Sequence, residues 1–554
     1  MRLRRKCSRR GAEEDLEIEE NLPFDVGGYW ATSPLCPPPP FLSPPPNPLG
    51  LQFRPPSRSK KRPLEPPLCL PPLCCDFNPR PSQCSVLSML FCLLVLFSMT
   101  SALQEDDFFR FTTTTQKPKY AGNKLLMVVL NGFRWDYISR DMEHLPNFRR
   151  FIEEGSSAPW LNSVFPADGY PAWASIATGL WPEDHGIIGN YFYDSGKREV
   201  FELNNLTSTR RAHWWQRAQP IWVTATMANR DTSVYLFSRC DVPYKGYRIP
   251  DCIGYNGSMN DLRYFDRHLE SAMEDFEQKD YAFSIVFNEY VGRLGRNHGP
   301  ESNLTFQGVR RVDKVLGHLF TRLRQSHLRY KINIMIVSDH GMSTLRRMKI
   351  INMDDHLHKY NIQVVIGRGG YMNIIPVAGL EDRLMKSIRR GLSDVRIYSK
   401  KDIPDRLHWK KSPLILPDLI LANEGVYLNA LSDPRQFPRG PSYTSFVPRG
   451  VHGFDPSYGD MRTIFMGWGP DFYEGYETNP LEMPDIYLVI SHLLSIPPIN
   501  DHAGSWQRVK YMLVNDAPFS IHRVFFEGNH WRQWGIFFSL VFLPFHYAPT
   551  LVYL

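Results

Sequence analysis

The sequence predicts an α/β protein whose mainly parallel central sheet is flanked by helices. From residue 121 onward, short apolar runs alternate with amphipathic stretches, an order typical of parallel strands joined by right-handed helical crossovers. The apolar runs are continuous, which indicates strands that are buried on both faces. Polar clusters follow several of these runs directly, and parallel sheets bind ligands beyond the carboxyl ends of their strands.

The expected strands consist of β-type apolar residues bounded by turn signals: Lys124–Leu130, Tyr281–Phe287, Ile332–Val337, Asp418–Ala422 and Thr463–Met466. Between them lie stretches with apolar residues at helical spacing, which we expect to be helices: Val312–Gln325, Glu381–Leu392 and Met483–Leu494. In the first of these, the apolar face is formed by Leu316, Leu319, Phe320 and Leu323.

Residues 1–84 differ from this body in composition. They hold 19 of the 46 prolines and a basic run at Arg58–Arg62. A segment with so little apolar surface cannot offset its ordering entropy, so we expect a Pro-rich disordered leader. A PxxP ligand for another domain is the alternative interpretation. The net charge of +7 is small for 554 residues, so no nucleic acid binding is expected.

A 14-residue apolar stretch, Val86–Met99, follows the leader and is succeeded by the small residues Thr100-Ser101-Ala102. The stretch is shorter than the ~20 residues of a spanning helix, and the small residues fit a secretory cleavage site. Residues 85–102 are therefore predicted to be a signal peptide or a signal anchor. Two explanations of the long leader stay open: a cytosolic tail on an uncleaved anchor, or a start codon placed too far upstream.

Residues 515–554 form a C-terminal tail whose last 20 residues, from Gly535 onward, are nearly all apolar. An apolar terminus after a polar stretch is the layout of a lipid-anchor (GPI) signal, and the residues at 515–517 are small enough for the attachment site. An ordinary transmembrane helix is disfavoured by Pro544, His546 and Pro549. We expect membrane association through such an anchor.

Three glycosylation sequons, at Asn205, Asn256 and Asn303, follow the signal segment, and together they fit a glycoprotein of the secretory pathway. Only two of the nine cysteines, Cys240 and Cys252, lie in the body. Two cysteines 12 residues apart in a secreted chain predict one local disulfide, with a buried free pair as the alternative. The body is therefore expected to be extracellular or on the cell surface.

Polar residues stand at the ends of three expected strands. Asn131 follows the first strand, Asn288-Glu289 the second, and Asp339-His340 the third. Because the carboxyl ends of parallel strands meet at one edge of a sheet, these clusters should converge on one site. Aspartate oxygen and histidine nitrogen suit zinc, so Asp339 and His340 are candidate metal ligands.

A set of motifs runs through the body in fixed order: LNGFRWDYI (130–138), FPADGYP (165–171), ATGLWPEDHGIIGNYFYD (177–194), QPIWVT (219–224), GRNHGP (295–300), SDHGM (338–342), RGVHGFD (449–455), MRTIFMGWGPDF (461–472) and GSWQRVKYML (504–513). In these motifs the chain resembles the ectonucleotide pyrophosphatase/phosphodiesterase family. The resemblance implies an alkaline-phosphatase-like fold and a phosphodiesterase-like catalytic-fold domain at 121–514. The last motif and the Cys240/Cys252 region look most like the choline-specific glycerophosphodiesterase member.

The resemblance also implies a site with two zinc ions about 4 Å apart and a Thr or Ser nucleophile. Several positions of that site are degenerate in this chain. The nucleophile is replaced by Gly169, a phosphate-holding Asn by Ala172, and three zinc ligands by Asn131, Gly292 and Arg296. The retained ligands are Asp339, His340 and His452.

These replacements change the expected chemistry. Glycine has no atom that can attack phosphorus, and the neighbouring Asp168 should point the other way if the backbone is extended. The replacements at 131, 292 and 296 each make the site one unit more positive, and an arginine cannot ligate zinc. We therefore expect no metal, or at most one weakly bound zinc at Asp339, His340 and His452.

Arg296 and Phe287 are candidate ligand-binding residues. A guanidinium beside Asp339 would satisfy both charges, and together with Arg293 and Arg134 it would hold a phosphate without cleaving it. The alternative is that Arg296 lies on a solvent-facing rim. Phe287 stands where choline-specific members place a Tyr against the trimethylammonium group; a core residue is the alternative.

The sequence thus predicts a secreted or surface-anchored pseudoenzyme that binds a phosphodiester or phosphocholine-type ligand, or an unknown protein partner, without hydrolysis. One alternative is a residual metal-dependent phosphodiesterase, with water on a single metal, that hydrolyses glycerophosphocholine-like or nucleotide diesters. The other alternative is an adhesive or structural ectodomain with no small-molecule site.

Overall fold

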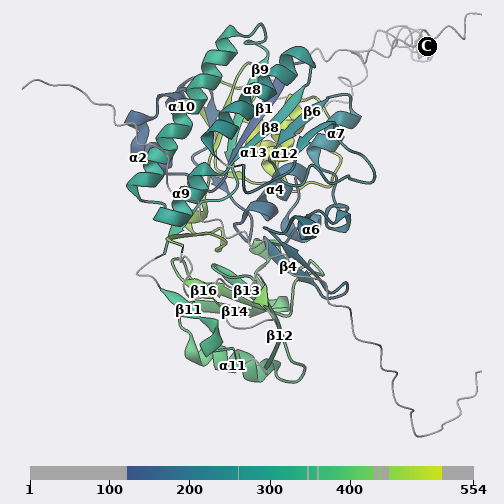
Figure 1. The fold of residues 1–554 in the computed structure, drawn as a ribbon, viewed down its shortest axis with the longest axis vertical. Helices are drawn as coiled ribbons and strands as arrows, with labels where there is room; N and C mark the ends of the chain where they lie inside the picture. The colour runs from purple at the N-terminus through teal and green to yellow at the C-terminus, as the bar shows by residue number, and fades with distance from the viewer. Residues whose placement is uncertain are drawn as a thin grey trace, which may run out of the picture. The chain divides into compact units, whose positions relative to one another are not determined.

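A mixed, mostly parallel sheet of eight strands forms the centre of the fold (Figure 1). The computed structural model describes residues 122–514 except 260, 346–348, 358–360, 430–435 and 438–447. These residues belong to one compact unit, Thr112–Leu554. The predicted leader (1–84), signal segment (85–102) and C-terminal tail (515–554) lie outside the described residues. Among the described helices, none has the length and apolarity to cross a membrane.

The strands of the central sheet follow the order β20 (Tyr476–Glu477), β2 (Ser156–Ser157), β19 (Phe465–Trp468), β9 (Ile332–Ser338), β1 (Lys124–Leu130), β8 (Phe283–Asn288), β6 (Thr232–Tyr235) and β7 (Asp251–Ile253). The five from β9 to β7 are parallel, whereas β19 runs antiparallel to both β9 and β2. The register aligns Leu130 with both Asn288 and Ser338. The three predicted polar clusters therefore leave the sheet at the same level.

Strand β1 is buried along its whole length, as its continuous apolar run predicts. Its alternate residues enter two different cores. Leu125, Met127 and Val129 pack with α4 (Gly169–Thr178), α7 (Ile221–Met227) and α12 (Asp485–Leu493). Leu126 and Val128 pack with α3 (Pro146–Glu153), α8 (Leu262–Gln278) and α10 (Asn303–Gln325). The sheet is thus covered by helices on both faces, which confirms the predicted fold class.

A second sheet of five strands has the order β14 (Val395–Ser399), β15 (Asp418–Ala422), β13 (Tyr371–Pro376), β12 (Ile362–Ile366) and β17 (Gln436–Phe437). Strand β15 has the predicted bounds, but it pairs antiparallel with both neighbours and lies outside the mostly parallel sheet. Its side chains alternate between two cores, and one of these contains α11 (Glu381–Gly391). Burial on both faces makes its sequence as apolar as that of a parallel strand.

Shorter elements connect and border the two sheets. The helices are α2 (Tyr137–Asp141), α5 (Pro182–His185), α6 (Leu206–Thr209), α9 (Tyr290–His298) and α13 (Trp506–Val509). The paired strands are β3 (Leu161–Asn162) with β21 (Leu481–Glu482), β4 (Tyr191–Asp194) with β5 (Glu199–Glu202), β10 (Ser343–Thr344) with β18 (Gly450–Val451), and β11 (Ile350–Asn352) with β16 (Tyr427–Asn429).

Asp418, the first residue of β15, makes the stability of the second sheet depend on pH. Burial, together with the nearby Glu381 carboxylate, raises the pKa of Asp418 to about 6. The folded state therefore disfavours the charged form, and stability is lost as the pH rises from about 4 through about 6. Asp418→Asn should stabilise the protein at pH 7.5 by roughly 1 kcal/mol, since a neutral amide avoids the cost of burying a charge.

Thermal unfolding at pH 4 and pH 7.5 measures this effect. The advantage of Asp418→Asn should appear at pH 7.5 and shrink at pH 4. Glu474→Gln is the matched control, because the Glu474 side chain is exposed and its neutralisation should change stability little at either pH. An equal gain for Asp418→Asn at both pH values would contradict the assignment.

Candidate functional site

A cavity of about 540 Å³ opens at the carboxyl ends of β1, β8 and β9. Most of the predicted site residues line it: Asn131, Gly169, Arg296, His340 and His452. The register of the sheet brings the residues after β1, β8 and β9 together. His452 arrives from another direction, because β18 pairs with β10 just after the SDHGM motif. The convergence of polar strand ends predicted from the sequence is confirmed.

The Asp339 carboxylate is fully buried and accepts four hydrogen bonds from neutral N–H groups. Its Oδ2 accepts from the Trp173 indole Nε1 and from the Asn131 amide Nδ2, both at 2.7 Å. Its Oδ1 accepts from the backbone N–H groups of Gly132 at 3.0 Å and His340 at 2.8 Å. Such bonds satisfy a buried carboxylate. Both oxygens of this predicted zinc ligand are therefore bonded to protein donors.

His340 is held as a neutral imidazole of defined tautomer. Its Nδ1 lies 2.7 Å from the Gly341 carbonyl, which can only accept, so Nδ1 carries the proton. Its Nε2 then accepts from the Asn131 Nδ2, at 3.1 Å. Burial lowers the pKa of His340 to about 4, which keeps the ring uncharged near neutral pH. The ring also stacks on that of His452, with 4.1 Å between centroids.

The Asn131 amide links the buried carboxylate to Arg296. Its Nδ2 donates to Asp339 and His340, and its Oδ1 accepts from Arg296 Nη1 at 3.1 Å. The acidic partner of Arg296 is Glu289, with 3.6 Å between Nη2 and Oε1, and Glu289 also accepts from the Tyr255 hydroxyl at 2.7 Å. The expected ion pair between Arg296 and Asp339 is therefore wrong, because N–H groups already bond both Asp339 oxygens. Arg296 also lines the cavity and is half-buried, so the alternative of a position at its rim stays open.

Asp168 points into the cavity and pairs with His452. The backbone of Asp168 is extended, with φ −130° and ψ 160°, as expected. Its carboxylate nevertheless lines the cavity, and its Oδ1 lies 2.8 Å from His452 Nδ1. The expectation that this side chain points away is wrong, because the chain at 452–453 passes directly beside it: a Cβ on Gly453 would lie 3.1 Å from Asp168 Oδ1.

Gly169 and Gly292, two of the degenerate positions, have no room for a larger residue. A Cβ on Gly169 would lie 2.9 Å from Cζ2 of Trp173. A Cβ on Gly292 would lie 2.4 Å from Oδ1 of Asn131 and 2.7 Å from its backbone oxygen. Trp173 and Asn131 therefore fill the space in which the family pattern places a hydroxyl and a carboxylate.

These donors do not fit a pair of zinc ions. Zinc binds through carboxylate oxygen, imidazole nitrogen or thiolate, whereas Asn131 directs its N–H groups at Asp339 and His340. Arg296 adds a permanent positive charge beside them. Within the described ranges, no group of three or more His, Cys, Asp or Glu side chains is arranged to hold a metal ion.

Three other predicted ligand-binding residues lie away from the cavity surface. Phe287 is fully buried and packs against Trp173, so its assignment to ligand binding is corrected to a core role. Arg134 is also buried, with Asp136 as its nearest acidic partner at 2.6 Å. Arg293 lies over the ring of Tyr290. Neither arginine joins Arg296 on the cavity wall.

Several cavity residues were missed by the sequence reasoning. Trp173 lies four residues after Gly169 on α4 and so shares its helix face, a spacing that was available to find it. Glu289 directly follows β8 and was noted only as part of a polar cluster. Arg368, Tyr371 and Tyr427 come from the second sheet and its neighbours, and no local pattern signals their position.

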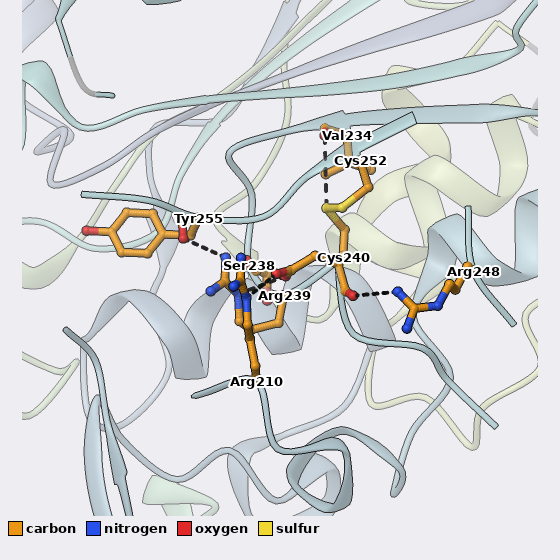
Figure 2. Close-up of a disulfide and its surroundings, with 9 residues drawn as sticks. Arg210, Val234, Ser238, Arg239, Cys240, Arg248, Cys252 and Tyr255 are labelled. Atoms are coloured by element: carbon orange, nitrogen blue, oxygen red, sulfur yellow. Dashed lines mark hydrogen bonds and ion pairs between the residues drawn. A yellow bond between two sulfur atoms is a disulfide. The ribbon is translucent and has the colours of Figure 1, made fainter. Parts of the chain in front are cut away.

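The cavity wall at Tyr255 is fixed by a disulfide between Cys240 and Cys252, whose Cα atoms are 6.0 Å apart (Figure 2). The bond confirms the predicted pairing. Arg239, next to Cys240, is buried and its Nη2 donates to the Tyr255 carbonyl at 2.5 Å. The Tyr255 N–H donates to the Ser238 carbonyl at 2.9 Å. The cross-link thus holds the segment that presents the Tyr255 hydroxyl to Glu289.

The predicted glycosylation sites lie on different parts of the surface. Asn205 and Asn303 are exposed, and Asn256 is half-buried. The Asn205 Oδ1 caps α6 by accepting from the Ser208 N–H at 3.0 Å, which leaves its Nδ2, the atom that carries a glycan, outside this hydrogen bond. Occupancy of the three sequons stays a prediction.

Gly169→Ala should destabilise the protein by about 1–3 kcal/mol, because the added methyl group overpacks the fixed Trp173 indole. Gly459→Ala is the matched control: its Cβ would meet no atom within 4 Å, and a small effect is expected. Chemical denaturation of both variants measures the difference. Equal stability of the two variants would show that Trp173 does not constrain position 169.

Removal of the disulfide should lower the free energy of unfolding by about 3 kcal/mol, since the bond spans 12 residues and restricts the unfolded chain. The double substitution Cys240→Ser and Cys252→Ser is compared with the unaltered protein by chemical denaturation. The two should converge in reducing buffer. A difference that persists under reduction would assign the loss to packing rather than to the cross-link.

Comparison with known proteins matches this geometry to one family. Residues 125–455 match the model of type I phosphodiesterase / nucleotide pyrophosphatase. Human ectonucleotide pyrophosphatase/phosphodiesterase family member 5 is 28% identical over 397 residues, which is 71% of this chain and 79% of that protein. Human bis(5'-adenosyl)-triphosphatase ENPP4 is 28% identical over 404 residues, 71% of this chain and 82% of that protein.

Solved structures give the same result. Human ENPP5 superposes with a TM-score of 0.65 at 27% identity and covers 71% of this chain and 100% of its own. An inactive threonine-to-alanine variant of murine ENPP5 in complex with AMP has a TM-score of 0.64 at 26% identity, with coverage of 71% and 100%. None of these relatives is named for a choline substrate, so the closer likeness to a choline-specific member stays a prediction. The chain belongs to the type I phosphodiesterase / nucleotide pyrophosphatase family.

Proposed function

We propose that this protein is an extracellular or surface-anchored pseudoenzyme of its family, which binds a phosphorylated ligand in the cavity and does not hydrolyse it. The observation that carries the proposal is the bonding of Asp339, whose two oxygens accept four N–H donors. A metal ion at either oxygen would have to displace these donors and leave them unpaired in a buried site, which is costly.

The proposed absence of catalysis rests on two requirements of the family's reaction, a nucleophile and a pair of metal ions. The position of the nucleophile is Gly169, whose lack of a side chain is enforced by Trp173. A dinuclear site would also face the Arg296 guanidinium, whose charge repels a dication at short range. We propose that the site holds no metal, or at most one weakly bound zinc at Asp339, His340 and His452.

The proposed retention of binding rests on the cavity. Its volume of about 540 Å³ lies within the range of small-molecule sites. Aromatic side chains line it alongside the charged ones, including Trp173, Tyr191 and Tyr427. The inactive murine ENPP5 variant was obtained in complex with AMP, so binding without turnover occurs in a relative. We propose a nucleotide or a phosphocholine-type compound as the ligand.

The proposed location outside the cell rests on the disulfide and on the relatives. The bond between Cys240 and Cys252 needs an oxidising compartment to form and persist. The relatives are ectonucleotide phosphodiesterases by name. Attachment to the membrane through the C-terminal tail is part of the proposal and concerns residues that the structure does not describe.

Metal content and turnover of the secreted protein test the proposal. Elemental analysis should find less than one zinc per chain. A chromogenic phosphorylcholine diester and diadenosine triphosphate should be hydrolysed no faster than by the His340→Ala variant. Human ENPP4, assayed in parallel on diadenosine triphosphate, is the positive control. Two zinc ions per chain, or turnover that disappears in His340→Ala, would establish an active phosphodiesterase instead.

A further inference from the structure

The loop at 367–370, between β12 and β13, brings a second arginine to the cavity. Arg368 lines the cavity from the side of the second sheet, together with Gly367 and Gly369. The two glycines have φ values of +91° and +85°, a region that favours glycine. The sequence Gly-Arg-Gly therefore allows the backbone to turn on both sides of the arginine.

The backbone of this loop is fixed by hydrogen bonds on both sides of Arg368. The Gly367 N–H donates to the Phe437 carbonyl at 2.8 Å, and the Gly369 N–H donates to the Leu428 carbonyl at 2.9 Å. The Gln436 side chain donates to the Gly367 carbonyl at 2.6 Å. A guanidinium on a fixed backbone loses less freedom when it binds a ligand.

Arg368 differs from the other basic groups of the cavity in having no partner among the residues that the structure describes. Arg296 is bonded to Asn131 and faces Glu289, and His452 is paired with Asp168. In the part of the chain that the structure describes, the Arg368 guanidinium forms neither a hydrogen bond nor an ion pair. It is half-buried, so it has lost part of its hydration without a counter-charge in return.

The floor of the cavity has the opposite electrostatic character. Three carboxylates, those of Asp168, Glu289 and Asp339, lie at or beneath it, against the single guanidinium of Arg296. In the family pattern two zinc ions offset such carboxylates; without them, the floor repels a phosphate dianion.

Three tyrosines line the cavity wall around Arg368: Tyr191, Tyr371 and Tyr427. The guanidinium lies close enough to Tyr191 and Tyr427 to oppose the rise in their pKa that burial causes, and both rings line the cavity. Tyr371, three residues after Arg368, has a buried hydroxyl with no hydrogen-bond partner among the described residues. A cation and aromatic side chains are thus available on one wall.

We propose that Arg368 forms an anion subsite, so that a ligand's phosphate is held at the wall of the second sheet rather than at the strand ends where the family pattern places the metal pair. The inference rests on the proposed function, since it assumes that the cavity binds a phosphorylated ligand. Nucleoside monophosphates and phosphocholine share the required chemistry, an exposed phosphate, and differ in the group that the rest of the cavity must accept.

The test is calorimetric titration of the purified ectodomain with AMP, adenosine, phosphocholine and choline. Arg368→Gln should weaken binding of the phosphorylated ligand by about 10–100-fold, as expected for loss of a charge-assisted hydrogen bond, and leave its dephosphorylated counterpart unchanged. Arg368→Lys should retain part of the affinity, because a point charge remains. Arg263→Gln is the matched control on the exposed surface of α8 and should bind like the unaltered protein.

The outcomes separate this inference from the proposed function. A loss in Arg368→Gln confined to AMP or to phosphocholine supports the subsite and identifies the ligand class. Unchanged affinity in Arg368→Gln, where the unaltered protein binds AMP or phosphocholine, overturns the subsite and leaves the proposed function intact. If the unaltered protein binds neither compound, both proposals fail. Arg368→Gln should fold normally, because Arg368 has no partner in the described residues.

Discussion

The arrangement of the site depends on one buried carboxylate and the four N–H groups that bond it. Asp339 has no access to water, and a buried charge of this kind requires several donors. Two donors are backbone groups at the strand ends, supplied by Gly132 and His340. The other two are the side chains of Asn131 and Trp173, one from β1's end and one from α4. The carboxylate thereby ties the sheet to the helix that covers it.

The residues that depart from the predicted family pattern depend on one another through the hydrogen bonds around Asp339. Trp173 can reach Asp339 only while position 169 lacks a side chain, and Asn131 occupies the space beside Gly292. Arg296 then completes the bonding of Asn131 by donating to its Oδ1. Residues in direct contact do not act additively, so reversal of any one of these positions creates a clash or an unpaired group. These side chains therefore form one packed, hydrogen-bonded unit.

Much of the fold follows from the sequence, because the apolar runs that form β1, β8 and β9 are buried on both faces and end in polar residues. The same signal predicted the strand Asp418–Ala422 but not its antiparallel pairing in a second sheet, since an antiparallel strand between two cores has the same apolar sequence. The degenerate positions stay predictions from the resemblance. The contacts around them could not be predicted from the sequence: Arg296 pairs with Glu289 rather than Asp339, because the number of donors around a buried carboxylate depends on packing. Arg368 could not be found, since it reaches the cavity from a separate sheet.

The cavity combines carboxylates, among them Asp168 and Glu289, with Arg368 on the wall of the second sheet, and in the proposed metal-free state this polarity would distinguish it from the dinuclear site of the family pattern. The most direct test of the central claim is anomalous X-ray diffraction at the zinc edge, from crystals of the ectodomain grown with excess zinc. We expect no pair of anomalous peaks near Asp339, and we expect the hydrogen bonds from Trp173 and Asn131 to Asp339 to be intact. Two strong peaks about 4 Å apart at the strand ends, with Asp339 turned from Trp173 to the metal, would contradict it.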